Sequence, residues 1–263
     1  MQRVGNEDAP LTGRFTILSL CLVCLWLALS AHAADSKGYP KYGPKEAPIA
    51  VPLSQSNDFF RNDENSAPDF WRLMPYYVPQ ITGGSCSVAS VAMIVNGFAR
   101  SGKALKDADT IIRQSDLLDS VKQHPWKKRR GLSLEKLNIV LSESLKIYGI
   151  SKGDTQMVQT KEDTPKAFNA FRRVLETNEQ SADDFLVVHY LQNVLTQAPG
   201  GPYPHISPIG AYDIKNRKVL ILDVDRKWYE PYWVSDKVLF EAMVEKTRYF
   251  GHGGYIRAWV PLK

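Results

Sequence analysis

Four short runs of β-branched and aromatic residues in the second half of the chain constrain the fold more than any other feature. They lie at 185–191, 205–212, 218–224 and 254–260, and each is bounded by Gly, Pro, Asn or Asp. Runs of this length and composition predict β-strands. Because no helical pattern alternates with them, we expect an antiparallel sheet and not a parallel one.

Apolar residues at helical spacing precede most of these runs. The pattern predicts helices over 85–100, 133–147 and 164–177, the second of them capped by Ser133. Helices followed by strands indicate an α+β fold. We expect a helical lobe packed against an antiparallel sheet lobe, with a cleft between the two.

The N-terminus has the features of a secretory signal. Arg3 and Arg14 precede an apolar stretch at 15–30, which an A-x-A site follows. This order predicts a signal peptide over 1–33, cut after Ala33. As a helix the stretch would span only about 24 Å, less than the ~30 Å of a hydrocarbon core, so cleavage is favoured over a permanent anchor. We therefore expect an exported bacterial protein, periplasmic or secreted, with no stable membrane anchor after cleavage.

The remaining chain divides in two by composition. Residues 34–53 are rich in Pro, Gly, Lys and Ala and predict an extended tether, and residues 54–263 would form the catalytic domain. The chain has 33 basic and 28 acidic residues, and its longest basic run, at 127–130, fits a solvated loop. No nucleic-acid partner is expected.

Cysteine usage points to one thiol. Two of the three cysteines fall within the predicted signal, which leaves Cys86 as the only cysteine of the mature chain. Cys86 stands where the first predicted helix begins, and the N-terminus of a helix stabilises a thiolate. The alternative is a small buried hydrophobe, which is the commonest role of a free cysteine.

Three other residues complete a candidate constellation. Gln80 lies before Cys86 across a Gly-rich turn, where its amide could donate to an oxyanion. His205 follows a Gly/Pro turn and opens a predicted strand, and Asp223 ends the next one, where burial would require a partner. Taken singly, Gln80 could be a surface residue and Asp223 a turn cap.

The hairpin between these strands offers a test. A two-residue loop at Lys215–Asn216 would place His205 and Asp223 on opposite faces of the sheet. A three-residue loop, or one bulge near Gly210, would return them to the same face. A triad of Cys86, His205 and Asp223 requires the second arrangement.

At these residues the chain, from about Phe59 onward, resembles the phytochelatin synthase family, a branch of the papain-like cysteine peptidases. The most specific segments are HISPIGAY at 205–212 and LDVDR at 222–226. The resemblance implies a triad of Cys86, His205 and Asp223, with Gln80 as oxyanion donor. It also implies that Arg226 lies beside the acyl-binding site, where it would suit a substrate carboxylate.

The resemblance also implies a reaction. The Cys86 thiolate would attack the Cys–Gly amide of glutathione, release glycine and hold γ-Glu-Cys as a thioester, which water or a second glutathione would accept. The expected partners are glutathione and γ-glutamyl thiol peptides. No cofactor and no protein-held metal are expected, whereas Cd or Zn could enter as glutathione thiolates, as substrates or activators. The plant members' Cys-rich extension has no counterpart before Lys263, so hydrolysis is expected over chain extension.

Two alternatives remain open. One is a papain-like peptidase that acts on leader peptides or γ-glutamyl peptides. The other is a catalytically inactive module that binds thiol peptides or metal. Release of glycine from glutathione would separate the expected enzyme from both.

Overall fold

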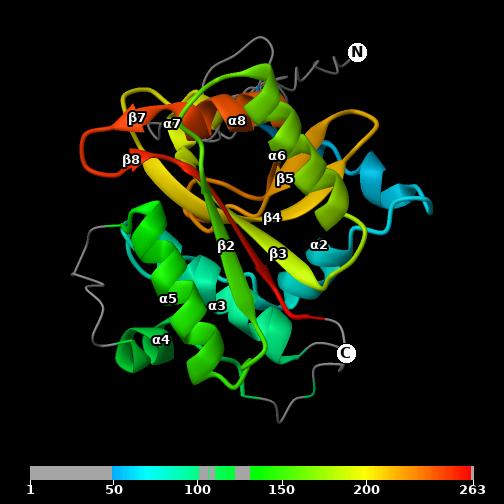
Figure 1. The fold of residues 1–263 in the computed structure, drawn as a ribbon. Helices are drawn as coiled ribbons and strands as arrows, with labels where there is room; N and C mark the ends of the chain where they lie inside the picture. The colour runs from blue at the N-terminus through cyan, green and yellow to red at the C-terminus, as the bar shows by residue number, and fades with distance from the viewer. Residues whose placement is uncertain (1–48, 101–105, 107–109, 122–130, 262–263) are drawn as a thin grey trace, which may run out of the picture. The chain divides into compact units, whose positions relative to one another are not determined.

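The computed structural model describes residues 49–100, 106, 110–121 and 131–261. Within them, one antiparallel sheet has the strand order β1-β6-β5-β4-β3-β9-β2 (Figure 1). Its strands are β1 (Val51–Pro52), β2 (Asp154–Gln159), β3 (Asp184–Leu191), β4 (Pro204–Asp213), β5 (Lys218–Ile221), β6 (Tyr232–Ser235) and β9 (Gly254–Trp259). A separate ribbon pairs β7 (Lys246–Thr247) with β8 (Gly251–His252).

The α+β class is as expected. The α-helices of the described residues are α2 (Pro68–Leu73), α3 (Cys86–Ala99), α4 (Gln114–Ser120), α5 (Leu134–Ile147), α6 (Pro165–Asn178), α7 (Gln192–Thr196) and α8 (Asp236–Val244). The helices α3, α5 and α6 confirm the three predicted ones to within one residue at each end. Ser133 caps α5 as predicted, because its hydroxyl accepts the N–H of Lys136.

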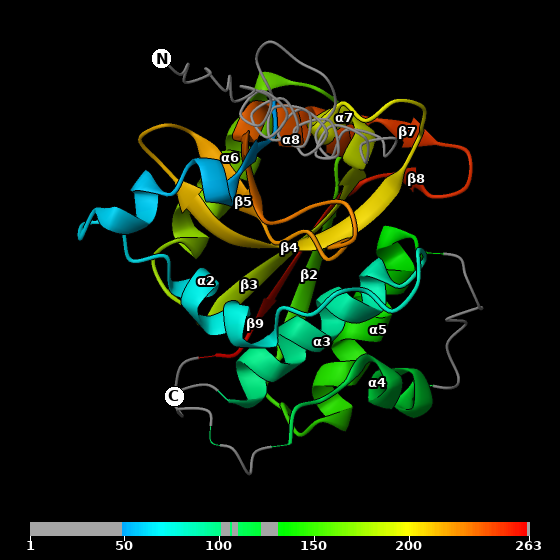
Figure 2. The same cartoon turned by 180° about the vertical axis from the view of Figure 1, so that it is seen from behind.

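Alternating side chains give the sheet two apolar faces. Phe185 and Val187 of β3 join a core with α3 and α5, and the intervening Leu186 joins a second core with α6 and α8. Figures 1 and 2 show α3, α4 and α5 on one side of the sheet and α6, α7 and α8 on the other. The expectation of one helical lobe facing a bare sheet lobe is therefore incomplete, since helices cover both faces.

Helix α3 is the central element of the first core. Every residue from Cys86 to Phe98 is buried, and the small side chains of this segment let the helix approach the sheet closely. The Ser90 hydroxyl donates to the Ile206 carbonyl of β4 at 3.1 Å. Phe98 packs on Phe185 of β3 with ring centroids 4.5 Å apart. These contacts fix the start of α3 relative to β4, and so position Cys86.

The packed domain begins earlier than expected. Ala50 is buried, and β1 pairs with the edge of β6. The last residues of the Pro-rich segment, Val51 and Pro52, thus add an edge strand to the sheet. The predicted signal peptide and residues 34–48 lie outside the described residues. In the part of the chain that the structure describes, none of the helices has the length and apolarity to cross a membrane.

Some elements differ from the predicted order. Strand β2 precedes α6, and α8 follows β6, so helices and strands are not fully segregated along the chain. The run at 218–224 forms a strand only as far as Ile221, and Asp223 lies just beyond its end. Strand β2 is mostly polar, and Asp154 and Gln156 are exposed, because it is the edge strand of the sheet.

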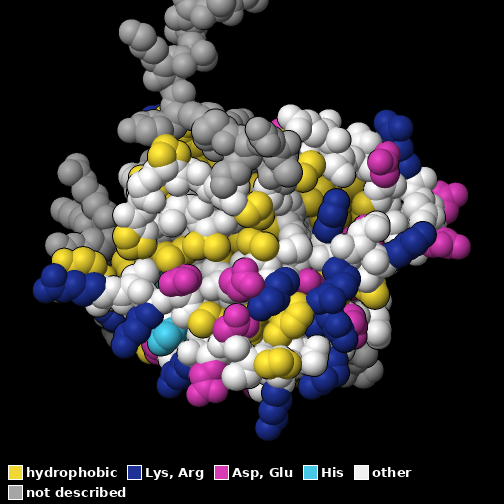
Figure 3. Space-filling model, turned by 90° about the horizontal axis from the view of Figure 1, so that it is seen from above, with side chains coloured by type: hydrophobic (Ala, Val, Ile, Leu, Met, Phe, Trp, Pro, Cys, Tyr) yellow, Lys and Arg dark blue, Asp and Glu magenta, His cyan; other side chains and the backbone are white. Residues whose placement is uncertain are grey.

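Charged side chains of both signs are interspersed on the face seen from above Figure 1 (Figure 3). Ion pairs join some of the exposed charged side chains among the described residues. Lys237 of α8 contacts both Asp163 and Glu241 at 3.1 Å, and Arg172 pairs with Glu176 along α6 at 3.4 Å. Exposed pairs of this kind contribute little to stability, about 0–1 kcal/mol each.

A bulge at Gly210 sets the register that the triad requires. Ile209 pairs with Ile221 while Ala211 pairs with Leu220, so Gly210 has no partner in β5. The Leu222 N–H then donates to the Pro208 carbonyl at 3.0 Å, which continues the shifted register toward Asp223. His205 and Asp223 therefore share one face, and the predicted bulge is confirmed.

Gly210→Ala is expected to destabilise the protein by about 1–3 kcal/mol, the usual cost of an overpacked core. A Cβ at this position would lie 2.8 Å from Cδ2 and 2.9 Å from Cγ of the fully buried Leu222. Chemical denaturation measures the change. Gly83→Ala is the control, because a Cβ there meets no atom within 4 Å. Equal stability of the two variants would contradict the assigned packing of the bulge.

Candidate active site

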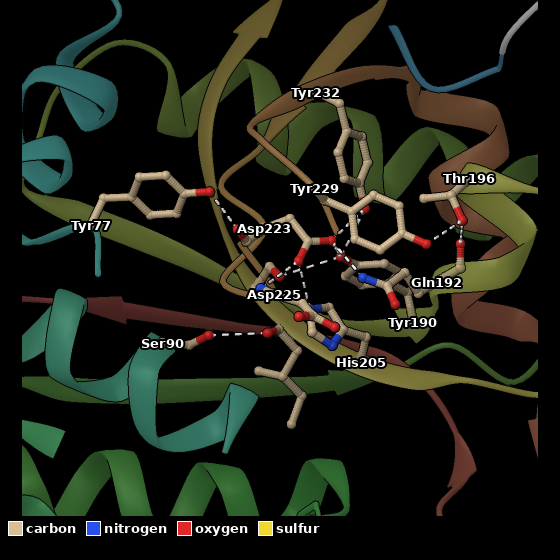
Figure 4. Close-up of polar contacts among 12 residues, drawn as sticks. Tyr77, Ser90, Tyr190, Gln192, Thr196, His205, Asp223, Asp225, Tyr229 and Tyr232 are labelled. Atoms are coloured by element: carbon tan, nitrogen blue, oxygen red, sulfur yellow. Dashed lines mark hydrogen bonds and ion pairs between the residues drawn. The ribbon is translucent and has the colours of Figure 1, made fainter. Parts of the chain in front are cut away.

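A fully buried carboxylate, that of Asp223, lies at the centre of the site (Figure 4). Its Oδ1 pairs with His205 Nε2 at 2.9 Å and accepts the backbone N–H of Asp225 at 2.9 Å. Its backbone carbonyl accepts the Tyr77 hydroxyl. The predicted His205–Asp223 pair is therefore present in the structure.

The second carboxylate oxygen is held by residues that the sequence pattern did not indicate. Asp223 Oδ2 accepts from Gln192 Nε2 at 2.8 Å, from the Tyr232 hydroxyl at 2.9 Å and, more weakly, from the Tyr190 hydroxyl at 3.4 Å. Tyr190 is the last residue but one of β3, Gln192 begins α7 and Tyr232 opens β6. Tyr190 falls within the predicted strand at 185–191, but no pattern in the sequence marks it, Gln192 or Tyr232 as a partner of Asp223.

His205 is buried at the start of β4, directly opposite Tyr190 of β3. Burial acts to lower its pKa, but the charge of Asp223, their hydrogen bond and the contact with Cys86 outweigh burial and hold the pKa well above its usual range. Since Nε2 is used by Asp223, Nδ1 is the ring nitrogen left for the thiol. The imidazole is thus placed between a carboxylate and a sulfur atom.

Cys86 is the first residue of α3, and its thiol lies close enough to His205 to help raise the pKa of the imidazole. The N-cap residue, Ser85, makes no side-chain capping bond, so the first N–H groups of the helix are not taken by the cap. Cys86 is also buried within the first core. The sequence left two roles for Cys86, a buried hydrophobe or a nucleophile. The position is buried and lies beside an imidazole, and the role as nucleophile stays a prediction.

Gln80 is tied to the segment that follows Asp223. Its backbone N–H donates to the Val224 carbonyl at 2.9 Å, and its side-chain amide lies near enough to the Asp225 carboxylate to lower the pKa of that group. The pKa of Asp225 is raised by burial and by the charge of Asp223, against the lowering effect of this contact. The predicted oxyanion role of Gln80 stays a prediction.

Arg226 lies one residue further on, exposed in the turn between β5 and β6. Its guanidinium carbon is 4.8 Å from the centroid of the Tyr77 ring. Within the described ranges no carboxylate is paired with it, so its donors can face a ligand. Because Tyr77 also contacts Asp223, the arginine is adjacent to the site, and its predicted contact with substrate stays untested.

The other histidines are less suited to serve as a base. His189 is buried in β3, and burial and His205 lower its pKa to about 4, so it is neutral at pH 7. His252 Nδ1 contacts the Val244 carbonyl at 2.6 Å, and His124 lies outside the described residues. In the described part of the chain, no group of three or more His, Cys, Asp or Glu side chains is placed to hold a metal ion.

Comparison with known proteins agrees with this geometry. A sequence profile of the phytochelatin synthase family matches residues 45–252. The chain belongs to the phytochelatin synthase family. The matched range contains every residue of the site described above.

Several named members of the phytochelatin synthase family are similar to the chain. Glutathione gamma-glutamylcysteinyltransferase 1 of Arabidopsis thaliana is 29% identical over 175 residues, covering 66% of this chain and 33% of the plant protein. The corresponding protein 1 of Lotus japonicus is 26% identical over 208 residues, covering 78% and 39%. The Schizosaccharomyces pombe enzyme is 23% identical over 207 residues, covering 78% and 47%. The chain thus spans less than half the length of each relative.

Tyr232→Phe is expected to destabilise the protein by about 1.5–3 kcal/mol, the usual worth of a hydrogen bond to a charged group. Despite burial, His205, the Asp225 N–H and Gln192 hold the pKa of Asp223 below its ordinary 3.8, so its contribution to stability is present above that pH and lost as the pH falls through the folded-state pKa. The difference between variant and wild type should therefore shrink below about pH 4. Denaturation at pH 7 and pH 3 measures it.

Tyr229→Phe is the matched control. It removes the same hydroxyl from a ring 6.0 Å from that of Tyr232, but this hydroxyl contacts Thr196 at 3.3 Å and not Asp223. We expect its effect to be smaller and to vary little between pH 7 and pH 3. If both substitutions cost the same at both pH values, the hydroxyl of Tyr232 does not support the charge of Asp223.

Proposed function

We propose that the protein transfers the γ-glutamylcysteinyl group of glutathione through a thioester on Cys86. The observation that carries the proposal is the buried His205–Asp223 pair, with the thiol of Cys86 in contact with His205, in a member of the phytochelatin synthase family. The names of its relatives supply the acyl donor, glutathione, and the transferred group.

The fold supports a papain-like relationship. In such a site the nucleophilic cysteine begins a central helix, and its base and orienting side chain come from neighbouring strands of an antiparallel sheet. Here Cys86 begins α3, His205 opens β4 and Asp223 follows β5, which fits this pattern. The lobe arrangement differs from a simple pair, since α6 and α8 cover the far face of the sheet.

The first half-reaction uses the thiol and the imidazole together. The Cys86 thiolate attacks the carbonyl carbon of the Cys–Gly amide, and the carbonyl oxygen becomes an oxyanion that the amide of Gln80 stabilises. His205 carries the proton that it took from the thiol, and it donates this proton to the departing glycine nitrogen as the C–N bond breaks. Asp223 keeps the imidazole oriented and favours its charged form.

In the second half-reaction His205 takes a proton from the acceptor, which attacks the thioester carbonyl and releases the Cys86 thiolate. Water as acceptor gives γ-Glu-Cys, and the amine of a second glutathione gives (γ-Glu-Cys)₂-Gly. Mass-resolved chromatography of the thiol products separates the two. Arg226 is proposed to bind a substrate carboxylate, since its guanidinium is exposed beside Tyr77.

Metal ions enter the proposal as part of the substrate. A Cd or Zn glutathione thiolate would present the same Cys–Gly amide to Cys86, with no ligand from the protein required. The chain is further proposed to act outside the cytoplasm of a bacterium, after removal of its N-terminal signal. Intact mass measurement of protein recovered from the periplasm and from the medium tests the location and the cleavage site.

Cys86→Ser should abolish glycine release from glutathione, lowering the rate by about 10³-fold or more, as loss of a catalytic nucleophile does. The reason is that a serine hydroxyl is not ionised by a neighbouring imidazole at neutral pH as a thiol is. Acid quench of the wild type followed by intact mass spectrometry should show one γ-glutamylcysteinyl adduct on Cys86, absent from the variant. Circular dichroism confirms that the variant is folded.

The alternatives give other results. Glycine release without an adduct on Cys86 would refute the covalent route. Cleavage of a leader peptide without action on glutathione would favour a peptidase of another specificity, and stoichiometric binding of glutathione or Cd without any product would favour a binding module. Parallel incubations with and without Cd also test whether the metal thiolate is the better substrate.

Gln80→Ala is expected to lower kcat by about 10²–10³-fold, the usual loss for one oxyanion donor. KM should change little, because the donor acts on charge that is present only in the transition state. Steady-state rates of glycine release over a range of glutathione concentrations separate the two constants. A rise in KM at constant kcat would move Gln80 from catalysis into substrate binding.

A further inference from the structure

The segment that carries Gln80 is a surface loop. Val78 and Pro79 before it and Ile81 after it are all exposed, Ile81 by 56%. These residues bury little apolar surface that could fix the course of the loop, so its position depends on hydrogen bonds. One of them is the bond from the Gln80 N–H to the Val224 carbonyl at 2.9 Å.

A buried glutamine, Gln114, bonds to the loop on both sides of Gln80. Its Nε2 donates to the Pro79 carbonyl at 2.8 Å, and its Oε1 accepts the Ile81 N–H at 3.2 Å. Gln114 is the first residue of α4 and is only 6% exposed. Its amide pairs with the loop backbone as a neighbouring strand would, with one end as donor and the other as acceptor.

Helix α4 is in turn tied to α3, the helix that Cys86 begins. The buried side chain of Asn96 in α3 makes the same kind of two-point contact with Ile112, two residues before α4. Its Nδ2 donates to the Ile112 carbonyl at 2.8 Å, and its Oδ1 accepts the Ile112 N–H at 2.9 Å. Figures 1 and 2 show α4 beside α3. The loop that carries Gln80 is therefore held, through Gln114, to the same helix as Cys86.

We propose that Gln114 is a positioning residue that fixes the backbone on both sides of Gln80 and so the place from which the Gln80 amide acts. An oxyanion donor must be in position before the charge develops, and a displacement of about 1 Å can cost about 10²-fold in rate. The inference rests on the proposed function, which gives Gln80 its role. The hydrogen bonds of Gln114 do not depend on that function.

A double-mutant cycle tests whether Gln114 acts through Gln80. Gln114→Met removes both hydrogen bonds and keeps a side chain of similar length. In the wild-type background it should lower kcat about 10-fold with little change in KM, because Gln80 acts on charge that is present only in the transition state. In the Gln80→Ala background it should lower kcat less than about 2-fold. Equal losses in both backgrounds, or a rise in KM at constant kcat, would overturn the proposal.

Gln159→Met is the matched control. Gln159 lies in β2, and its Nε2 donates to Glu135 Oε1 at 3.1 Å and to the His252 carbonyl at 3.4 Å, not to the loop of Gln80. The substitution should leave kcat and KM unchanged. A loss of kcat equal to that of Gln114→Met would mean that removing any bonded amide has this effect, which also overturns the proposal.

Gln114→Glu is the second variant, for the case in which Gln114→Met does not fold. It has nearly the shape of glutamine and keeps an acceptor for the Ile81 N–H, but at neutral pH it has no donor for the Pro79 carbonyl. It should therefore lower kcat without raising KM. Full activity of this variant would show that the bond to Pro79 is not needed, and would overturn the two-point contact as the means of positioning.

Amide hydrogen exchange needs no substrate and separates this inference from the proposed function. The Ile81 N–H should exchange about 10-fold faster in Gln114→Met than in wild type and in Gln159→Met, because it loses its acceptor, whereas the amides of the central strand β3 should not change. Unchanged exchange at Ile81, or equal acceleration in β3, overturns the inference. If the wild type releases no glycine, the proposed function fails, and the exchange rates still decide whether Gln114 holds the loop.

Discussion

The buried charge of Asp223 is the interaction on which the site depends. An unpaired carboxylate in the interior would cost several kcal/mol or change its protonation state. Here its oxygens meet five donors, namely His205, the Asp225 N–H, Gln192, Tyr232 and Tyr190. The donors come from four parts of the chain, and all four must be in place before the charge is satisfied. The carboxylate thereby couples formation of the site to assembly of the sheet.

The bulge in β4 provides the strand register that lets His205 pair with the charge of Asp223. Without the extra residue at Gly210, the alternation of the strand would turn His205 away from Asp223. The tight contact between Gly210 and Leu222 shows why a residue without a Cβ occupies the bulge. The bulge at Gly210 therefore satisfies two requirements of the hairpin: the tight packing against Leu222 and the register that pairs His205 with Asp223.

Local patterns were sufficient for much of the fold. The three helices confirmed by the structure are signalled by apolar spacing and, for α5, by the Ser133 cap, which are properties of neighbouring residues. The need for either a three-residue loop or a bulge near Gly210 also followed from the sequence, because side-chain alternation is a rule of local geometry. Strand β2 escaped prediction because its outer face is exposed and polar, and the packing of β1 depends on pairing with β6, far away in the chain.

The candidate site was predictable only in its chemically distinctive members. Cys86, His205 and Asp223 stand out by residue type and position, and the structure brings the last two together and the first beside them. Gln192 and Tyr232 do not stand out, since glutamine and tyrosine are common and their role exists only through a partner remote in sequence.

Two carboxylates two residues apart show how donors, and not burial alone, decide the charge. Asp223 is the more deeply buried, yet its pKa is lowered, because the imidazole and the surrounding donors outweigh the loss of water. The pKa of Asp225 is raised by burial and by the charge of Asp223, with fewer donors to oppose them. The charge that stabilises the imidazolium of His205 is thus kept on Asp223.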